Sequence, residues 1–184
     1  MIEQLSFQEY QELAKRTQNP DLSPIETLCH ATLGLCSELS ETLDELERIR
    51  SRRPESRENA SKEIGDCCWM ISEMCDCLGI GFENVMLINS ERSPLYSDCW
   101  NCIDKAVQST VSLCSSVQKL LQGHPIVNDD AAHQIREIMR FLHMACDAID
   151  MDIHHVLWLN IEKLRKRYPD GFSSERSVNR EDAE

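Results

Sequence analysis

Four carboxylate side chains form two pairs with the same three-residue spacing. Glu38 and Glu41 make the first pair, and Glu63 and Asp66 make the second. Residues three apart lie on one face of an α-helix, so the two carboxylates of each pair point the same way. A short polar linker at residues 52–56 predicts that the two helices are antiparallel neighbours. The four carboxylates then converge and repel one another unless a cation lies between them. Mg²⁺ prefers oxygen ligands and bridges carboxylates and phosphates, so the spacing predicts a magnesium site.

The residues around Asp66 favour a partly buried site over a solvated acidic face. Glutamates three apart are common on exposed helices, so the first pair alone is a weak signal. Gly65 lies in mid-helix, where glycine costs about 1 kcal/mol relative to alanine, which suggests that another segment approaches closely. An apolar run, residues 67–71, follows Asp66 directly. Asp66 is therefore expected at the edge of a buried segment.

The elements that would position these pairs are helices. Apolar residues recur at steps of three and four along most of the chain, which is typical of amphipathic helices. Aromatic residues make up only 5% of the chain, with six Gly and six Pro, which argues against a β-sandwich or barrel. Gly79 is expected to cap the third helix. The predicted helices are residues 7–17, 26–50, 58–78, 82–89, 96–122, 129–149 and 153–168, with a polar tail at 173–184.

The chain is strongly acidic, with a formal net charge of −13 over 184 residues. Such a chain is repelled by nucleic acid and by anionic membranes, so we expect neither as a partner. A polyanionic substrate would need bound divalent cations to invert the local field. The sequence contains no apolar run of about 18 residues and no signal-peptide pattern, so the expected location is the cytoplasm.

Ten cysteines raise the alternatives of disulfides and of a zinc site. Cytosolic thiols stay reduced, which argues against disulfides. Cys99 and Cys102 form one C-x-x-C, and Cys75 and Cys77 form a C-x-C, but no second pair at zinc-finger spacing is present. We therefore expect most cysteines to be small buried side chains.

A weak internal repeat relates two parts of the chain. Residues 62–89 align without a gap on residues 133–160, at an offset of 71. Residues 32–43 align on residues 110–121 at an offset of 78. The offset falls from 78 to 71 between the two aligned segments, as expected if the loop between them is shorter in the second copy. Duplication is one interpretation, and chance similarity between amphipathic helices is the other.

Under the duplication hypothesis, residues 1–94 and 95–172 are two four-helix-type halves, fused as a pseudo-dimer in one compact unit. The matched cysteines, which suit a packing face, are Cys36 with Cys114 and Cys75 with Cys146. The second-half counterparts of the four carboxylates are, in chain order, Ser116, Lys119, Gln134 and Glu137. Only one acidic residue survives there, so a single metal site is expected, in the first half.

Residues 34–41, GLCSELSE, and residues 62–69, KEIGDCCW, resemble the ExxE…ExxD signature of the MazG-like all-α nucleoside triphosphate pyrophosphohydrolases. This superfamily includes dimeric dUTPases, dCTP pyrophosphatases and phosphoribosyl-ATP pyrophosphohydrolases. Residues 10–17 and 160–180 are similar to the opening and closing segments of small members. The family often has two adjacent glutamates at the start of the signature, where this chain has Ser37 and Glu38.

The resemblance implies a MazG-like bundle and hydrolysis of a (d)NTP between the α- and β-phosphates, giving a nucleoside monophosphate and pyrophosphate. It implies Mg²⁺, with Mn²⁺ able to substitute, held by the two carboxylate pairs. Glu41 is our candidate to orient or deprotonate the attacking water. Lys163 and Arg167 lie four apart on one helix face, where they would balance charge on the leaving pyrophosphate. A solvated basic face that includes residues 165–167 is the alternative. A homodimer of pseudo-dimers is compatible with this interpretation.

Further candidates for substrate contact are Asn160, Tyr168, Trp69 and His30, although core packing or a surface position is an alternative for the last three. Two other classes remain open. One is a non-catalytic nucleotide-binding or scaffold protein on a partly degenerate MazG-like fold. The other is a ferritin-type di-iron bundle, which requires Glu-x-x-His pairs that the candidate glutamates lack.

Overall fold

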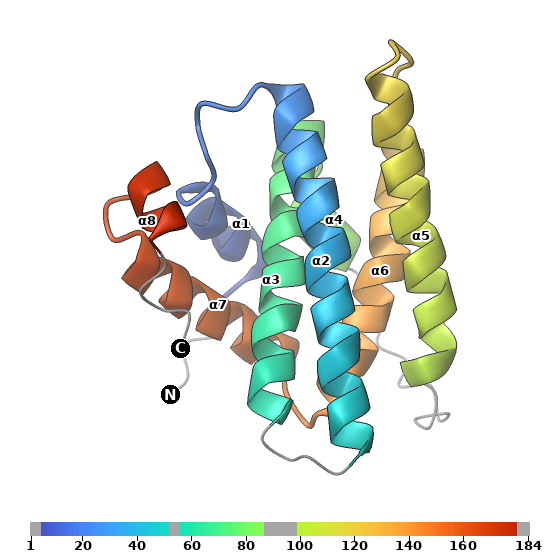
Figure 1. Cartoon of the computed structure of the whole chain (residues 1–184), viewed down its shortest axis with the longest axis vertical. Helices are drawn as coiled ribbons and strands as arrows, with labels where there is room; N and C mark the ends of the chain where they lie inside the picture. Colours follow the sequence, from blue (N-terminus) through green and yellow to red (C-terminus); the bar gives the residue numbers. More distant parts are fainter. Residues whose placement is uncertain (1–4, 52–55, 87–98, 180–184) are drawn as a thin grey trace.

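The computed structural model describes residues 5–51, 56–86 and 99–179, with residues 99–104 described by their backbone alone (Figure 1). Within these ranges the chain forms eight α-helices and no β-strand, which confirms the predicted all-α fold. The helices are α1 (Phe7–Lys15), α2 (Pro24–Arg50), α3 (Ser56–Leu78), α4 (Phe82–Met86), α5 (Cys99–Leu120), α6 (Asn128–Ala148), α7 (Ile153–Arg167) and α8 (Ser174–Val178).

The start of α2 shows why some predicted bounds were wrong by a few residues. We expected this helix from residue 26, but it begins at Pro24. The Ser23 side chain accepts a hydrogen bond from the Glu26 backbone N–H, and the Glu26 carboxylate accepts one from the Ser23 N–H. Proline suits the first helical position because no N–H is needed there. The Ser23-Pro24 pair therefore starts the helix instead of only interrupting the chain.

Gly79 ends α3 as predicted. Its φ angle is +67°, in the left-handed region that favours glycine. The N–H of Ile80 donates to the carbonyl of Cys75 at 2.8 Å, which closes the last turn of the helix. The chain then enters α4, and the predicted continuation of that helix to residue 89 lies outside the described residues, as does the predicted start of the fifth helix at residue 96.

Two antiparallel helix hairpins form the centre of the fold (Figure 1). The first hairpin is α2 with α3, as expected from their short connection, and the second is α5 with α6. The hairpins meet where α2 packs against α5, with the two helices running in opposite directions. α1 and α7 both pack on α3, whereas α4 packs on α6. The last long helix therefore packs mainly on the first hairpin, although it follows α6 of the second hairpin in the sequence.

One cluster of buried side chains runs through both hairpins. Its fully buried large members include Tyr10, Leu35, Ile64, Phe82, Ile135 and Phe141. Burial of each such side chain contributes about 1.5–3 kcal/mol to folding. The shared cluster fixes the positions of α2, α3 and α7 relative to one another, and these three helices carry the predicted site.

The cysteines divide into two groups. Those that are buried are Cys67, Cys68, Cys75 and Cys146, and those that are partly exposed are Cys29, Cys36, Cys77 and Cys114. Burial raises the pKa of the Cys67 and Cys68 thiols well above the usual value. The expectation of buried cysteines is therefore correct for the first group and too strong for the second. The side chains of Cys99 and Cys102 lie outside the described residues.

The polar segment after α7 contains one helix that we did not predict. α8 begins after Ser173, whose side chain accepts a hydrogen bond from the backbone N–H of Arg176. Gly171, with a φ angle of +99°, makes the turn that precedes it. Among the described helices, none combines the length and apolar character that crossing a membrane requires.

Candidate metal centre

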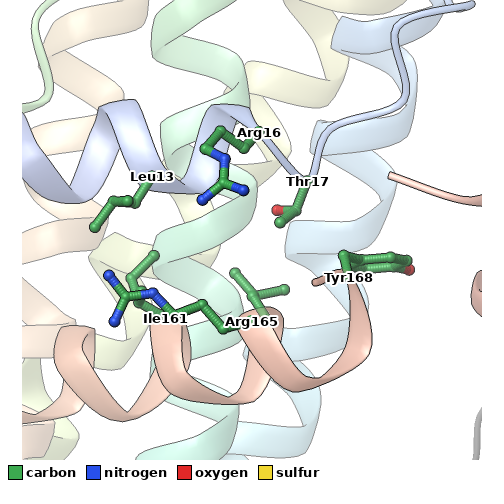
Figure 2. A pocket seen from close by; sticks show the side chains of 7 residues that line it. Leu13, Arg16, Thr17, Ile161, Arg165 and Tyr168 are labelled. Carbon is green, nitrogen blue, oxygen red and sulfur yellow. The ribbon is translucent and has the colours of Figure 1, made fainter. Parts of the chain in front are cut away.

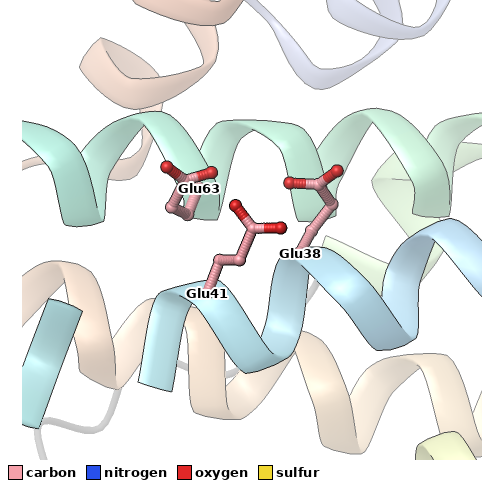
Figure 3. A group of neighbouring side chains, drawn as sticks. All are labelled: Glu38, Glu41 and Glu63. Carbon is pink, nitrogen blue, oxygen red and sulfur yellow. The ribbon is translucent and has the colours of Figure 1, made fainter. Parts of the chain in front are cut away.

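Three glutamates from two helices converge between α2 and α3 (Figure 3). Glu38 and Glu41 project from α2, and Glu63 projects from α3. One carboxylate oxygen of each lies within 4.8 Å of the others, close enough for a shared cation. Three hard oxygen donors at this spacing suit Mg²⁺ or Mn²⁺ and offer no sulfur or imidazole ligand to a softer metal. The structure thus brings together three of the four predicted ligands.

Asp66, the fourth predicted ligand, lies beside this group and contacts α7. Both of its carboxylate oxygens are in contact with the Lys163 ammonium, and Oδ1 also accepts a hydrogen bond of 2.8 Å from Asn160 Nδ2. The ion pair is only partly exposed. The side chains that we predicted to meet the substrate from the last helix, Asn160 and Lys163, therefore do reach the carboxylate site.

Gly65 explains how α7 comes so close to α3. A Cβ atom at Gly65 would lie 3.0 Å from the Cβ of Asn160 and 3.2 Å from its Nδ2. The close approach predicted from this mid-helix glycine is confirmed, and its partner is α7. The Tyr10 hydroxyl donates to Asn160 Oδ1 at 2.9 Å and so fixes the orientation of the amide. We did not predict a role for Tyr10, although it begins the segment, residues 10–17, that is similar to the opening segment of the family.

The electrostatics of the group favour a bound cation. Burial, together with the charges of Asp66, Glu41 and Glu63, raises the pKa of Glu38 to about 7. Burial, followed by the charges of Asp66 and Glu41, also raises the pKa of Glu63. Clustered carboxylates disfavour one another's charged form, and a divalent cation removes that penalty.

Glu45 is a further carboxylate that we did not single out. It lies four residues after Glu41 on α2, is buried, and pairs through one oxygen with Arg48. Its other oxygen is buried and has no hydrogen-bond partner among the described residues. Its charge also contributes to raising the pKa of Glu63. The helical spacing from Glu41 was the signal that places it next to the centre.

His30 and Trp69 belong to a separate polar cluster. His30 Nδ1 lies 2.6 Å from Oε2 of the buried Glu73, a contact that raises the pKa of His30. Trp69 Nε1 donates to Thr17 Oγ1 at 2.9 Å, and its ring lies perpendicular to the His30 ring at 6.0 Å. Each side chain has a structural partner here, and neither forms a described hydrogen bond to the three glutamates.

Tyr168 and Arg167 end α7 on the side of α1. Tyr168 is buried, packs against Phe172 at 5.8 Å, and lines a small pocket between α1 and α7 (Figure 2). Figure 2 shows Arg16 and Arg165 on opposite sides of this pocket. Its volume of about 10 Å³ is of the order of one water molecule, too small for a nucleobase. Arg167 is half-buried, and its carbonyl accepts a bond from Arg176 at 3.5 Å.

The matching positions of the second hairpin carry different chemistry. Glu137, the counterpart of Asp66, pairs with Arg140 on its own helix at 3.7 Å. Ser116, the counterpart of Glu38, donates to the carbonyl of Ser112. Among the described residues, only Glu38, Glu41 and Glu63 form a group with metal-binding geometry.

Comparisons with protein-family models, curated proteins and solved structures gave no match for this chain.

Proposed function

We propose that this protein is a Mg²⁺-dependent nucleoside triphosphate pyrophosphohydrolase. The observation that carries the proposal is the meeting of two sets of side chains from distant parts of the chain. Carboxylates of α2 and α3 converge as a candidate cation site, and Asn160 and Lys163 of α7 reach its edge through Asp66. A triphosphate bound to metal ions needs both negative ligands for the metal and a nearby cation for the phosphates.

Each group of this site has a role that follows from its position. Glu38, Glu41 and Glu63 would hold the metal, with Asp66 as the neighbouring carboxylate. When bound, Mg²⁺ supplies neutralisation of phosphate oxygens and a lowered pKa for a coordinated water. Glu41 is the exposed member of the three, and Ser37 Oγ donates to its Oε1 at 3.2 Å. It is therefore our candidate to orient the attacking water and accept its proton.

The α7 side chains would act on the phosphates. Lys163 places an ammonium beside the carboxylates, where it can stabilise the charge that develops on the leaving pyrophosphate. Asn160 is buried and held between Tyr10 and Asp66, so its amide keeps a fixed orientation. An ordered amide of this kind positions Asp66 at no further entropic cost during turnover.

The reciprocal packing of the hairpins supports the pseudo-dimer hypothesis. α7 packs on α3, whereas α4, which aligns with the start of α7 in the repeat, packs on α6. Cys36 and Cys114, which match in the repeat, meet where α2 crosses α5, with their sulfur atoms 3.5 Å apart. Equivalent residues meet in this way near a two-fold axis. In this arrangement the second half supplies the helix that completes the site of the first half.

A pyrophosphate-release assay over a panel of NTPs and dNTPs, with and without Mg²⁺, tests the proposal. We expect metal-dependent release from at least one nucleotide, and loss of that activity in Asp66→Asn. Glu137→Gln is the matched control, because it changes the repeat-equivalent carboxylate, which pairs with Arg140 away from the centre. Nucleotide binding without turnover would favour the non-catalytic alternative, and absence of both would contradict the proposal.

A further inference from the structure

Two cysteines from different hairpins lie in direct contact. Cys36 belongs to α2 and Cys114 to α5, and their sulfur atoms are 3.5 Å apart where these helices pack together. The two residues are 78 positions apart in the chain, so only the packing of one hairpin on the other brings them together. Neither thiol has a role in the proposed activity, because the candidate metal centre lies between α2 and α3.

Both thiols can be reached from solvent. Cys36 and Cys114 are partly exposed, whereas Cys67 is fully buried. The residues three positions before each cysteine of the pair are also open, since Leu33 is 70% exposed and Val111 is 62% exposed. A small oxidant can therefore approach the pair from the outer side of α2 and α5.

The geometry of the pair suits formation of a disulfide. Because the sulfur atoms of a disulfide are about 2.05 Å apart, the two atoms must approach by about 1.5 Å, which a rotation of the side chains about Cα–Cβ provides. Reacting atoms that are held about 3–3.5 Å apart react far faster than free molecules in solution. α2 and α5 run in opposite directions here, so the two side chains approach from facing helix surfaces (Figure 1).

We propose that Cys36 and Cys114 form a reversible disulfide that links the two hairpins when the chain meets a small disulfide such as glutathione disulfide. One thiolate of the pair attacks a sulfur atom of glutathione disulfide, which forms a mixed disulfide and releases one glutathione thiolate. The other thiol of the pair loses its proton and attacks the protein sulfur of the mixed disulfide, which releases the second glutathione thiolate. Two protein thiols are oxidised in this way, and one glutathione disulfide is reduced to two thiols.

The first of these steps should be slow and dependent on pH. Burial, followed by the hydrogen bond with Cys114, raises the pKa of the Cys36 thiol to about 11. Little of this thiol is ionised at neutral pH, and only the thiolate attacks a disulfide. The second step is fast by comparison, because its nucleophile is already in contact with the sulfur atom that it attacks. The mixed disulfide should therefore not accumulate in the wild type.

The link would stabilise the packing of the two hairpins. A bond between α2 and α5 joins residues 78 positions apart and so restricts the unfolded chain, which should raise the temperature of unfolding by about 10 °C. The link itself does not depend on the proposed activity, because it can be measured without substrate.

Thiol mapping on the intact chain tests the inference. The reduced protein is incubated with glutathione disulfide, quenched in acid and alkylated, and the linked peptides are identified by mass spectrometry. We expect one predominant link, between Cys36 and Cys114, that forms at least about tenfold faster than any other protein disulfide and is removed by dithiothreitol. Its rate of formation should rise about tenfold per pH unit between about pH 7 and pH 9.

Two variants remove one thiol of the pair at a time. Cys36→Ser and Cys114→Ser should each abolish the link, and the remaining thiol should then accumulate as a mixed disulfide with glutathione. Cys29→Ser is the matched control, because Cys29 is also partly exposed and lies on the same helix as Cys36. It should keep both the link and the higher temperature of unfolding. Far-UV circular dichroism shows whether each variant keeps its helix content.

Three results would overturn the inference. One is a wild type that stays reduced in millimolar glutathione disulfide, or that accumulates the mixed disulfide at either cysteine. Another is a link that joins Cys36 or Cys114 to a different residue, or that Cys29→Ser abolishes equally. The third is a link between Cys36 and Cys114 that fails to raise the temperature of unfolding, since the bond would then not join the hairpins in their native arrangement.

Discussion

The two helix hairpins share a packing pattern but differ in chemistry. Leu35 and Ile64 of the first hairpin are buried, and so are their counterparts Leu113 and Ile135 in the second. The acidic positions behave differently, because Glu38, Glu41 and Glu63 converge as a group of carboxylates. Three of the four matching positions of the second hairpin carry no carboxylate, since they hold Ser116, Lys119 and Gln134. A core position must keep its volume and apolar character for the hairpin to fold, whereas a site position is free to change once its function is lost.

The two hairpins also differ in the helix that packs against each of them. α3 packs against α7, which brings Asn160 and Lys163 to the carboxylates. α6 packs against the five-residue α4, and Arg136 donates there to the carbonyl of Asn84 at 3.4 Å. The same type of contact therefore serves a candidate site in one case and only packing in the other. Paired substitutions in the two hairpins test this distinction.

The largest difference is expected for the carboxylates themselves. Glu41→Gln or Asp66→Asn should lower nucleotide turnover by about 1,000-fold or more, because metal and phosphate positioning fail together. Glu137→Gln should leave turnover unchanged, since its ion pair with Arg140 is exposed on one side and contributes little. Steady-state kinetics at saturating nucleotide and Mg²⁺ measure both. Turnover close to wild type in Asp66→Asn would show that the chemistry lies elsewhere.

The next largest difference in turnover is expected between substitutions of Lys163, beside the carboxylates, and Lys119, at the repeat-equivalent position of Glu41. Lys163→Ala should reduce turnover by about 100-fold, since removing a donor that stabilises developing charge typically costs a few kcal/mol. Lys119 matches Glu41 in the repeat but is exposed on α5, so Lys119→Ala should leave turnover within about twofold of wild type. Single-turnover measurements separate this effect from substrate binding. Equal effects of the two substitutions would contradict a contribution of α7 to the site.

The pH dependence of the metal-free protein gives a smaller effect with a definite sign. The pKa of Glu38 is raised to about 7, so near pH 6 the folded chain holds a proton that the unfolded chain has released. Stability from this group is therefore present below its ordinary pKa of 4.5 and is lost as the pH rises through 7. Thermal unfolding without metal should show a larger fall between about pH 4.5 and pH 7 for wild type than for Glu38→Gln.

The same proton competes with the cation. Mg²⁺ binding requires the ionised carboxylate, so the apparent affinity should rise as the pH increases through about 7. Calorimetry in two buffers of different ionisation enthalpy measures the proton that is released on binding. Glu137→Gln should follow the wild type in both experiments. An affinity for Mg²⁺ that is constant between pH 6 and pH 8 would contradict a role for Glu38 as a ligand.

Periodicity and turn chemistry were sufficient to predict most of the fold. Apolar spacing predicted the helices that contain Leu35 and Ile64, and their short connection predicted that the two are antiparallel neighbours. Gly79 marked the end of α3. The start of α2 was misplaced because Pro24 has two meanings, as a helix breaker and as a first helical residue. The signal that distinguishes these two meanings is the capping pair of Ser23 and Glu26, which the apolar pattern does not include.

The candidate site was predictable in its ligands but not in its neighbours. Glu38, Glu41 and Glu63 follow from helix spacing, which is local. The hydrogen bond from Tyr10 to Asn160 joins residues 150 apart in the chain, and no local pattern encodes such a contact. His30 contacts Glu73, which lies 43 residues away in the chain, instead of facing a substrate. Glu73 is buried because α2 and α3 pack together, and the sequence around His30 does not encode this packing.

The smallest effect on stability, and a sharp one on activity, is expected at Gly65. In Gly65→Ala the new methyl group would lie 3.0 Å from the Asn160 Cβ, so α7 must shift by a few tenths of an ångström. Alanine also favours the helix by about 1 kcal/mol, which offsets part of that strain. The free energy of unfolding should therefore change little. Turnover should fall by about tenfold, because Asn160 and Lys163 move relative to Asp66.

Arg136 occupies the position of Gly65 in the second hairpin, where the side chain is exposed and contacts α4. Arg136→Ala should therefore leave turnover unchanged, although it loses the 3.4 Å contact to the Asn84 carbonyl. Urea unfolding and pyrophosphate release, measured on both variants, distinguish two explanations of the close contact at Gly65. A large loss of stability with normal turnover in Gly65→Ala would mean that the approach of α7 serves packing alone. A loss of turnover at nearly constant stability would mean that the glycine is required because it lets α7 place its amide and ammonium beside Asp66.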